Sequence, residues 1–368
     1  MAGSEQLAGE GRRLVSLDAL RGADMFLLVG ITGIVRALPE ISDHPFFSDL
    51  SEQFRHPPWH GFTLYDLIFP LFIFIVGAAM PFSFARRLER GDRRWGLFGH
   101  VLARTILLTI LGLIYWGTSG GAHPTYGYYS VLYRIGISYF FAAIILMNLR
   151  PVGWAICALI LIIGYEAALQ FVPVPQHGAG NFTKEGCLPT YVAEQVSLAI
   201  SPKFAYVLSI TLIPTVATAL FGALAGEWLR SNRGPGRKTV GLLLWGAIFL
   251  GVALFTPNLV PINKHLWSTS FTLLTAGISF VLLGLAYWMI DVRGWRRPAF
   301  FFVVVGMNPI VIYLAERLID FRKLANVFVG EYMEALGTAG PLVNAITAAA
   351  LMWLFLYFLY VNKAFLRI

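Results

Sequence analysis

The chain has 368 residues, of which 57% are hydrophobic and only 13% are charged. Soluble globular proteins carry about a quarter of charged residues, so this composition excludes an ordinary soluble domain. The net charge of +8 does not indicate nucleic-acid binding, because no basic stretch is interleaved with aromatic residues in a soluble region. The two cysteines, Cys157 and Cys187, predict no disulfide framework.

Ten apolar runs are each long enough to cross a hydrocarbon core of about 30 Å. They predict an all-α integral membrane protein, a single bundle of about ten transmembrane helices. No small-residue cleavage site follows the first run, so we expect no removable signal peptide. We divide the chain into a cytoplasmic N-terminal segment, 1–17, and a transmembrane domain, 18–368. The predicted spans are 18–38, 63–86, 95–117, 129–147, 152–172, 203–229, 238–256, 265–290, 297–318 and 340–362.

The loops between these runs alternate in charge. Seventeen of the 28 Lys and Arg residues lie at the termini and in every second connection, and six lie in the other connections. Lys and Arg mark cytoplasmic loops, so an even number of spans with both termini in the cytoplasm is predicted. The longer loops, 39–62 and 173–202, then face the outer side, where long ordered loops tend to carry function.

The densest group of chemically versatile residues spans 55–70, where the first outer loop enters the second span. Two prolines keep His56 and His60 off a regular helix, and Asp66 follows about one turn inside the span. An imidazole held near a carboxylate suits general-base catalysis. An interfacial loop that anchors the helix through His and Trp explains the pattern equally well. No further ligand set lies nearby, so no metal is expected.

Ionisable residues inside the spans are functional candidates by default. Mutual pairing, for example of Asp18 with Arg21, or snorkelling to the interface is the alternative. Arg104 and Arg134 lie too deep to snorkel easily, so a functional role is favoured for them. The full set is Asp18, Arg21, Asp24, Asp66, Arg104, Arg134, Glu166 and Glu316.

Two spans carry small polar residues at helical spacing, a pattern that is more typical of close helix packing than of a wet cavity. Asn308 lies in the ninth span beside a proline. Its amide could donate to a developing oxyanion, and it could equally satisfy the backbone break at the proline. The stripes are Thr211, Thr215, Thr218 and Gly222 in the sixth span and Ser268, Thr272, Thr275 and Ser279 in the eighth.

Several segments together resemble one family, the transmembrane acyltransferases typified by heparan-alpha-glucosaminide N-acetyltransferase and its bacterial homologues. The resemblance implies a transmembrane acyltransferase domain over 18–368 and transfer of an acetyl group from acetyl-CoA to a sugar amine. The family's catalytic histidine lies in a His-x-x-Trp-x-Gly motif, which carries onto His56, whereas His60 inherits no role. The matching segments, in the family's order, are 16–22, 56–77, 131–136, 221–226, 261–268 and 306–309.

Two departures from the animal members indicate a bacterial member. The long luminal segment before the first helix is missing, and 30–33 reads Gly-Ile-Thr-Gly where the animal members place an Asn. We therefore expect a multi-pass protein of the bacterial inner (cytoplasmic) membrane, whose acceptor is not inherited with the fold. The expected partners are acetyl-CoA, an amino sugar or glycan acceptor and the lipid bilayer, without nucleic acid, and a homodimer is left open.

The resemblance leads to a hypothesis for the mechanism. Acetyl-CoA is kept in the cytoplasm whereas His56 is predicted outside, so the bundle must bring the acyl group across the membrane. His56 would act as the base, with Asp66 orienting it, or would carry the acetyl group covalently. An O-acetyltransferase of an envelope glycan and a small-solute transporter are the alternatives.

The remaining candidates are assigned to the donor and to the oxyanion. Arg21 and Arg104 would meet phosphate charge at the inner surface, with the pantetheine arm along the two polar stripes. The oxyanion would be stabilised by Asn263, Lys264 or Asn308. The full donor-binding set is Arg21, Arg104, Arg134, Lys264, Trp267 and Ser268.

Overall fold

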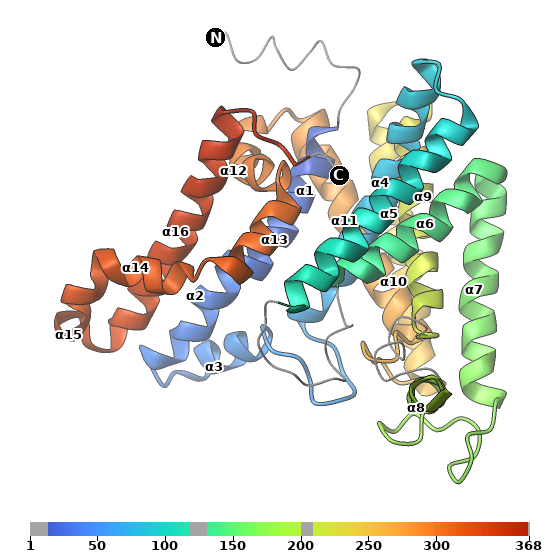
Figure 1. The fold of residues 1–368 in the computed structure, drawn as a ribbon, viewed down its shortest axis with the longest axis horizontal. Helices are drawn as coiled ribbons and strands as arrows, with labels where there is room; N and C mark the ends of the chain where they lie inside the picture. Colours follow the sequence, from blue (N-terminus) through green and yellow to red (C-terminus); the bar gives the residue numbers. More distant parts are fainter. Residues whose placement is uncertain (1–13, 118–130, 200–208, 367–368) are drawn as a thin grey trace.

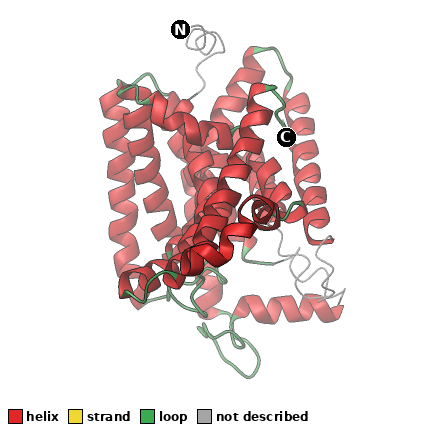
Figure 2. Cartoon of the chain, turned by 90° about the vertical axis from the view of Figure 1, so that its left-hand side faces the viewer, coloured by secondary structure: helices red, strands yellow, loops and turns green. Residues whose placement is uncertain are grey.

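The computed structural model describes residues 14–117, 131–199 and 209–366, which fold into one bundle of helices (Figures 1 and 2). Within these ranges there is no β-strand. Nine of the described helices are long and apolar enough to cross a membrane, and the count is ten if a bent pair forms one span. The structure thus confirms the prediction of an all-α membrane protein of about ten spans.

The helices begin and end close to the predicted runs. The first span combines α1 (Val15–Phe26), a π-helical turn (Leu27–Ile31) and α2 (Thr32–Ala37), and the eighth combines α11 (Thr269–Ala286) with a π-helical turn (Tyr287–Val292). The other continuous spans are α4 (Leu64–Glu89), α5 (Arg94–Gly117), α6 (Val131–Asn148), α7 (Pro151–Phe171), α9 (Leu212–Arg230), α10 (Pro235–Phe255) and α16 (Gly340–Val361).

The structure differs from the predicted runs in two places. The sixth span was predicted from residue 203, but its helix begins at Leu212, and 200–208 lie outside the described residues. The ninth span is broken into α12 (Arg296–Gly306) and α13 (Pro309–Leu318), which meet at an angle of 57°. Proline has no amide hydrogen and disfavours helical backbone at the preceding residue, so the break falls at Asn308.

Short helices gather at one end of the bundle (Figure 1). We call this end, which also carries the loops around 53–63 and 259–268, the site end; α1 begins and α16 finishes at the opposite end. Both ends of the described chain therefore lie on one side, as an even number of spans requires. The short helices are α3 (Pro45–Glu52), α8 (Leu188–Ala199), α14 (Phe321–Val329) and α15 (Met333–Leu336).

Glycines hold two pairs of spans at backbone contact. A Cβ atom at Gly222 would overlap the carbonyl of Phe74, and one at Gly77 would overlap that of Ala219, so α4 and α9 meet without side chains between them. Gly22 of α1 and Gly306 of α12 meet in the same way. Small residues that let helices approach closely are typical of membrane bundles.

The two polar stripes take part in this packing. Thr215, Thr218, Thr275 and Ser279 are fully buried, and each hydroxyl donates to a carbonyl of its own helix. Such bonds satisfy the one donor hydrogen of each hydroxyl inside the helix bundle. These four residues favour the packing interpretation of the stripes over the predicted path for the pantetheine arm.

Candidate active site

The loop that precedes α4 is shaped by glycine, proline and a helix cap. Gly61 has φ +123°, a conformation that L side chains rarely adopt, and its amide donates to the carbonyl of Ile262 at 2.9 Å. Thr63 caps α4, and its amide donates to Oδ2 of Asp66 at 3.2 Å. The carboxylate of Asp66 is thereby fixed in the first turn of the helix, facing the loop that carries His56.

A histidine, a carboxylate and a lysine meet at this position. His56 Nδ1 lies 2.7 Å from Oδ1 of Asp66, and Lys264 Nζ lies 3.2 Å from the same oxygen and 3.4 Å from His56 Nδ1. The Asp66 side chain is fully buried, whereas those of His56 and Lys264 are 45% and 21% exposed. When Nδ1 donates to the carboxylate, the lone pair of Nε2 is left for a substrate proton.

A second loop, 261–268, supplies Lys264 and docks on the first loop. The Asn263 amide donates to the carbonyl of Trp59 at 2.8 Å and lies 3.2 Å from Nδ1 of His60, while its oxygen accepts from the Leu266 amide. The hydroxyl of Ser268 donates to the carbonyl of Pro261. Asn263 and Ser268 are both fully buried; the amide nitrogen of Asn263 joins the two loops, and the Ser268 hydroxyl and the Asn263 oxygen hold the second loop in shape.

The groups around the mouth of the site differ in charge. Burial lowers the pKa of Lys264, and the carboxylate of Asp66 opposes that shift. Burial also lowers the pKa of His60, and burial followed by the charge of Lys264 lowers that of His265. Both shifts favour the neutral form of these imidazoles. His265 stacks on Trp59 with ring centroids 5.3 Å apart.

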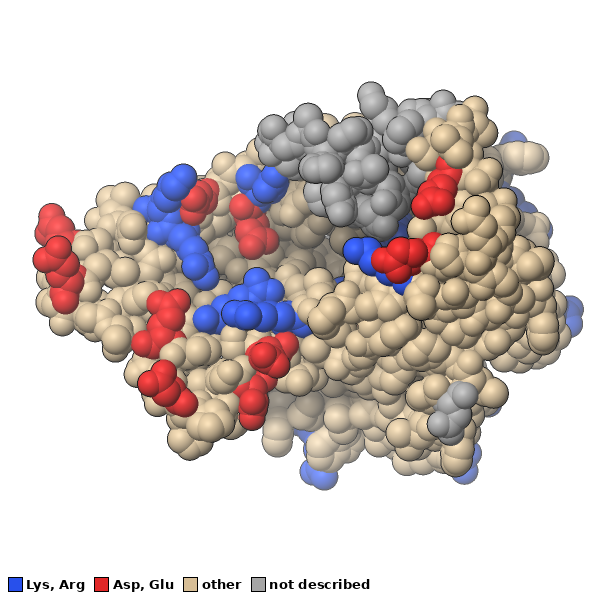
Figure 3. Space-filling view, turned by 90° about the horizontal axis from the view of Figure 1, so that it is seen from below, with Lys and Arg blue, Asp and Glu red and all other residues tan. Residues whose placement is uncertain are grey.

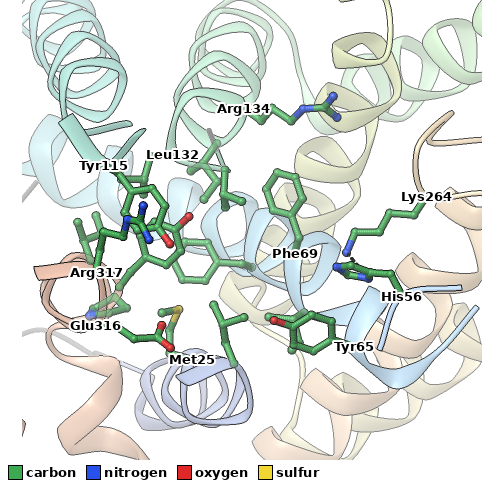
Figure 4. A pocket seen from close by; sticks show the side chains of 18 of the residues that line it. Met25, His56, Tyr65, Phe69, Tyr115, Leu132, Arg134, Lys264, Glu316 and Arg317 are labelled. Atoms are coloured by element: carbon green, nitrogen blue, oxygen red, sulfur yellow. Dashed lines mark hydrogen bonds between the residues drawn. The ribbon is translucent and has the colours of Figure 1, made fainter. Parts of the chain in front are cut away.

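A cavity of about 640 Å³ extends from this group into the bundle. Figure 4 shows His56 and Lys264 on one side of it, with Glu316 and Arg317 across from them. Its walls are mainly aromatic and aliphatic side chains, as expected for a small-molecule pocket with a few polar groups. The wall residues contributed by α4 and α6 are Tyr65, Ile68, Phe69, Phe72, Val131, Leu132, Arg134 and Ile135.

The predicted donor-binding residues are divided between this cavity and other places. Arg134, Lys264 and Trp267 line it, and Arg134 also donates to the hydroxyl of Thr211 at 3.0 Å. The guanidinium of Arg104 instead packs over the ring of Tyr139, 4.5 Å from its centroid. Arg21 lies at the start of the first span, 3.4 Å from Asp18. Neither Arg104 nor Arg21 is among the residues that line the cavity.

Asn308 is buried at the bend of the ninth span and does not reach His56. Its Nδ2 donates to the carbonyl of Ala364 at 3.0 Å, and its Oδ1 accepts from the amide of Leu366 at the same distance. The asparagine thus holds the segment that follows α16. These two bonds go to backbone groups of residues 364 and 366 and not to those freed at the helix break, so they correspond to neither of the roles considered from the sequence.

Several residues of the cavity were not predicted from the sequence. Tyr115 of α5 and Tyr313 of α13 stack with ring centroids 4.5 Å apart and form one wall with Arg317. The sequence does indicate Glu316, next to Arg317, as an ionisable residue inside a span, and this is the one feature that points to this wall. In the part of the chain that the structure describes, no group of three His, Cys, Asp or Glu residues could hold a metal ion.

Two curated proteins are similar to the chain over nearly its whole length, and both are named heparan-alpha-glucosaminide N-acetyltransferase. The protein of Homo sapiens is 26% identical, with 97% of this chain and 60% of the relative aligned, and that of Mus musculus is 26% identical, with 99% and 62% aligned. The chain therefore spans about 60% of the length of these relatives. Residues 13–120 match a family model described as a domain of unknown function, DUF5009. The resemblance found in the motifs is confirmed.

Proposed function

We propose that the chain is a membrane-embedded acetyltransferase that moves an acetyl group from acetyl-CoA to the amine of an amino sugar or glycan. The observation that carries this proposal is the contact of His56 with Asp66 and Lys264 at the mouth of a deep, largely apolar cavity. The similarity to two proteins named as N-acetyltransferases supports the same reaction.

The chemistry follows from the placement of the three side chains. The acceptor nitrogen attacks the thioester carbonyl carbon, and Nε2 of His56 takes the proton from the nitrogen as the C–N bond forms. Asp66 holds the ring through Nδ1 and stabilises the imidazolium. The ammonium of Lys264, at the same mouth, stabilises the negative charge on the carbonyl oxygen. The C–S bond then breaks, and the imidazolium returns the proton to the departing thiolate of CoA.

The apolar part of the cavity suits the uncharged acyl and pantetheine portion of the donor. The aromatic walls formed by Phe69, Phe72 and the Tyr115–Tyr313 stack exclude water, which strengthens electrostatic interactions at the reacting atoms. Exclusion of water also protects the thioester from hydrolysis. Arg134, on the same wall, supplies a cation for the polar groups of the donor.

The basic loops give the proposed orientation. The connections rich in Lys and Arg join the spans at the opposite end, which we therefore assign to the cytoplasm. The site end with His56 then faces the outer side of the membrane. In this arrangement the donor approaches from one side and the acceptor from the other, and the bundle connects them.

Acetyl transfer by purified protein tests the proposal. We expect labelled acetyl-CoA to acetylate glucosamine and His56→Ala to lower kcat by about 10²–10⁴-fold, the contribution of a general base. CoA should still raise the melting temperature of the variant. His177→Ala, a change in an exposed loop, is the matched control and should behave as the wild type. Turnover of His56→Ala close to the wild-type rate would contradict the assignment.

The product distinguishes the proposal from its alternatives. Mass analysis identifies an amide when the acceptor reacts at nitrogen and an ester when it reacts at oxygen. A trapped acetyl-His56 would replace direct transfer by a covalent route. Stabilisation by a transported solute, without stabilisation by CoA, would instead favour a transporter.

A further inference from the structure

A second cavity of about 480 Å³ lies beside the first at the site end. Its walls come from the end of the first span, from α13, from the start of α14 and from α16. The two cavities share Leu28, Tyr65, Glu316 and Arg317. Because the two cavities adjoin along these residues, one ligand can occupy both of them.

Three arginines from three elements face this second cavity. Arg36 follows the first π-helical turn, Arg317 lies in α13 and Arg322 lies in α14. Figure 3, which views this end of the molecule, shows Lys and Arg side chains gathered in the middle of the face, with acidic side chains around them. A planar guanidinium presents two parallel N–H groups, the arrangement that binds carboxylate, sulfate or phosphate.

Two of these guanidinium groups are held in place by the backbone. Nε and Nη2 of Arg36 donate to the carbonyl of Phe54 at 3.1 and 2.6 Å, and Nη2 of Arg322 donates to that of Gly33 at 3.4 Å. These carbonyls fix the side chains without neutralising them. Groups fixed in advance lose less entropy when a ligand binds.

The acidic residues of the cavity do not cancel this charge. Asp320 caps α14 by accepting from the amide of Lys323 at 3.0 Å, and it pairs with the Lys323 ammonium at 3.3 Å. The negative charge of Asp320 is therefore balanced by Lys323, which does not line the cavity. Glu316 remains against three arginines, which leaves an excess of positive charge.

Tyr65 connects the second cavity to the candidate base. Its ring centroid lies 4.8 Å from that of His56, and the guanidinium carbon of Arg36 lies 5.2 Å from the Tyr65 centroid. The ring of Tyr65 thus lies between the imidazole and the guanidinium of Arg36. An amine at His56 and an anionic group at Arg36 thus fit within one small molecule or one end of a glycan.

We propose that the second cavity binds an oxoanion carried by the acceptor, so that the preferred acceptor is an amine that also bears a carboxylate, sulfate or phosphate group. This inference rests on the proposed acetyl transfer at His56. Arg36, Arg317 and Arg322 bind the oxoanion, and this contact positions the amine beside the imidazole. A carboxylate would indicate a uronate-containing acceptor, whereas a sulfate or a phosphate would indicate a sulfated or a phosphorylated sugar.

Acetylation rates with paired acceptors test this inference. We compare glucosamine with its 6-phosphate, its 6-sulfate and a glucosaminyl-uronate disaccharide. We expect kcat/KM for at least one anionic acceptor to exceed that for glucosamine by tenfold or more, the contribution of one charge-assisted contact. Arg322→Gln should lower this ratio about tenfold through KM, and Arg322→Glu should lower it further. Arg237→Gln, an exposed change at the opposite end of the bundle, should leave the ratio unchanged.

Binding is measured separately, so that failure of this inference differs from failure of the proposed function. Inorganic sulfate and glucosamine 6-phosphate should raise the melting temperature of the wild type, and Arg322→Gln should weaken this effect. If these ions stabilise the protein but no acceptor is acetylated, the anion site stands and the proposed acetyl transfer fails. If acetylation occurs with equal kcat/KM for neutral and anionic acceptors, the inference is overturned.

Discussion

The imidazole of His56 and the carboxylate of Asp66 meet at 2.7 Å across the junction between a loop and a helix. One carboxylate performs two tasks here. Its Oδ2 accepts from the backbone amide of Thr63 at the start of α4, while its Oδ1 accepts from the imidazole. The orientation of His56 is therefore coupled to the geometry of the helix cap.

Replacement of the carboxylate tests this coupling. Asp66→Asn keeps the shape of the side chain but removes the charge that fixes the imidazole. Loss of such a supporting partner typically costs about 10–100-fold in activity, and we expect kcat to fall by this amount while the donor still binds. Asp92→Asn, an exposed carboxylate paired with Arg87, is the control. A kcat within twofold of the wild type would show that Asp66 does not orient the base.

The same substitution also leaves Lys264 without its anion. We expect Asp66→Asn to lower stability by about 1–3 kcal/mol, the usual cost of a buried polar group without its partner. Adding Lys264→Met should restore the melting temperature but not the activity. An equal fall in melting temperature in Asp66→Asn and in the double variant would contradict the pairing of these two residues.

Lys264 predicts a pH dependence of stability. Because burial lowers its pKa in the folded state, the unfolded chain binds more protons between that lowered value and 10.5. Stability contributed by this position should therefore rise with pH in this alkaline window. The difference in melting temperature between wild type and Lys264→Met measures this contribution, with His265, Arg134 and Asp66 left unchanged. A difference that falls toward pH 10.5 would contradict the assignment.

The contact of α4 with α9 gives a prediction for stability alone. In Gly222→Ala the added Cβ would overlap the carbonyl of Phe74, so the helices must separate. Overpacking of this kind typically costs about 1–3 kcal/mol. Gly251→Ala in α10, where no neighbour lies within 4 Å, is the control and should be neutral or stabilising. Thermal unfolding of both variants in one detergent checks the difference, and equal melting temperatures would count against this packing.

The sequence could predict the spans because the thickness of a bilayer sets the length of an apolar run. It could also predict the proximity of His56 and Asp66, which lie ten residues apart in one segment. It could not predict the contact of Lys264 with this pair, since Lys264 lies 208 residues from His56. That contact arises because two loops dock at one end of the bundle.

The cavities were harder to predict for the same reason. The Tyr115–Tyr313 stack joins two spans that no local pattern connects. The fixed orientation of Arg36 and Arg322 depends on carbonyls of other segments. For Asn263 the sequence suggested a role at the oxyanion, but its side chain joins two loops. Burial and hydrogen bonding decide whether such a side chain has a catalytic or a structural role, and neither property can be read from a single sequence.

The bend at Asn308 bears on how the donor enters. The cavity reaches Phe72 of α4 and Pro309 of α13, and Asn308 next to it holds the segment after α16 through two hydrogen bonds. If the donor enters from the opposite end, we expect the segment 363–366 to affect its access to the cavity.

Asn308→Ala and removal of residues 363–368 separate access from chemistry. If Asn308 acts by holding this segment, both changes should alter KM for acetyl-CoA alike, and their combination should add little, as is typical of residues in contact. If Asn308 instead donates to the oxyanion, only Asn308→Ala should lower kcat, by about 10²–10³-fold. Steady-state kinetics of the two variants and their combination distinguishes these outcomes. The two hydrogen bonds to Ala364 and Leu366 favour the first, because they already occupy both polar atoms of the amide.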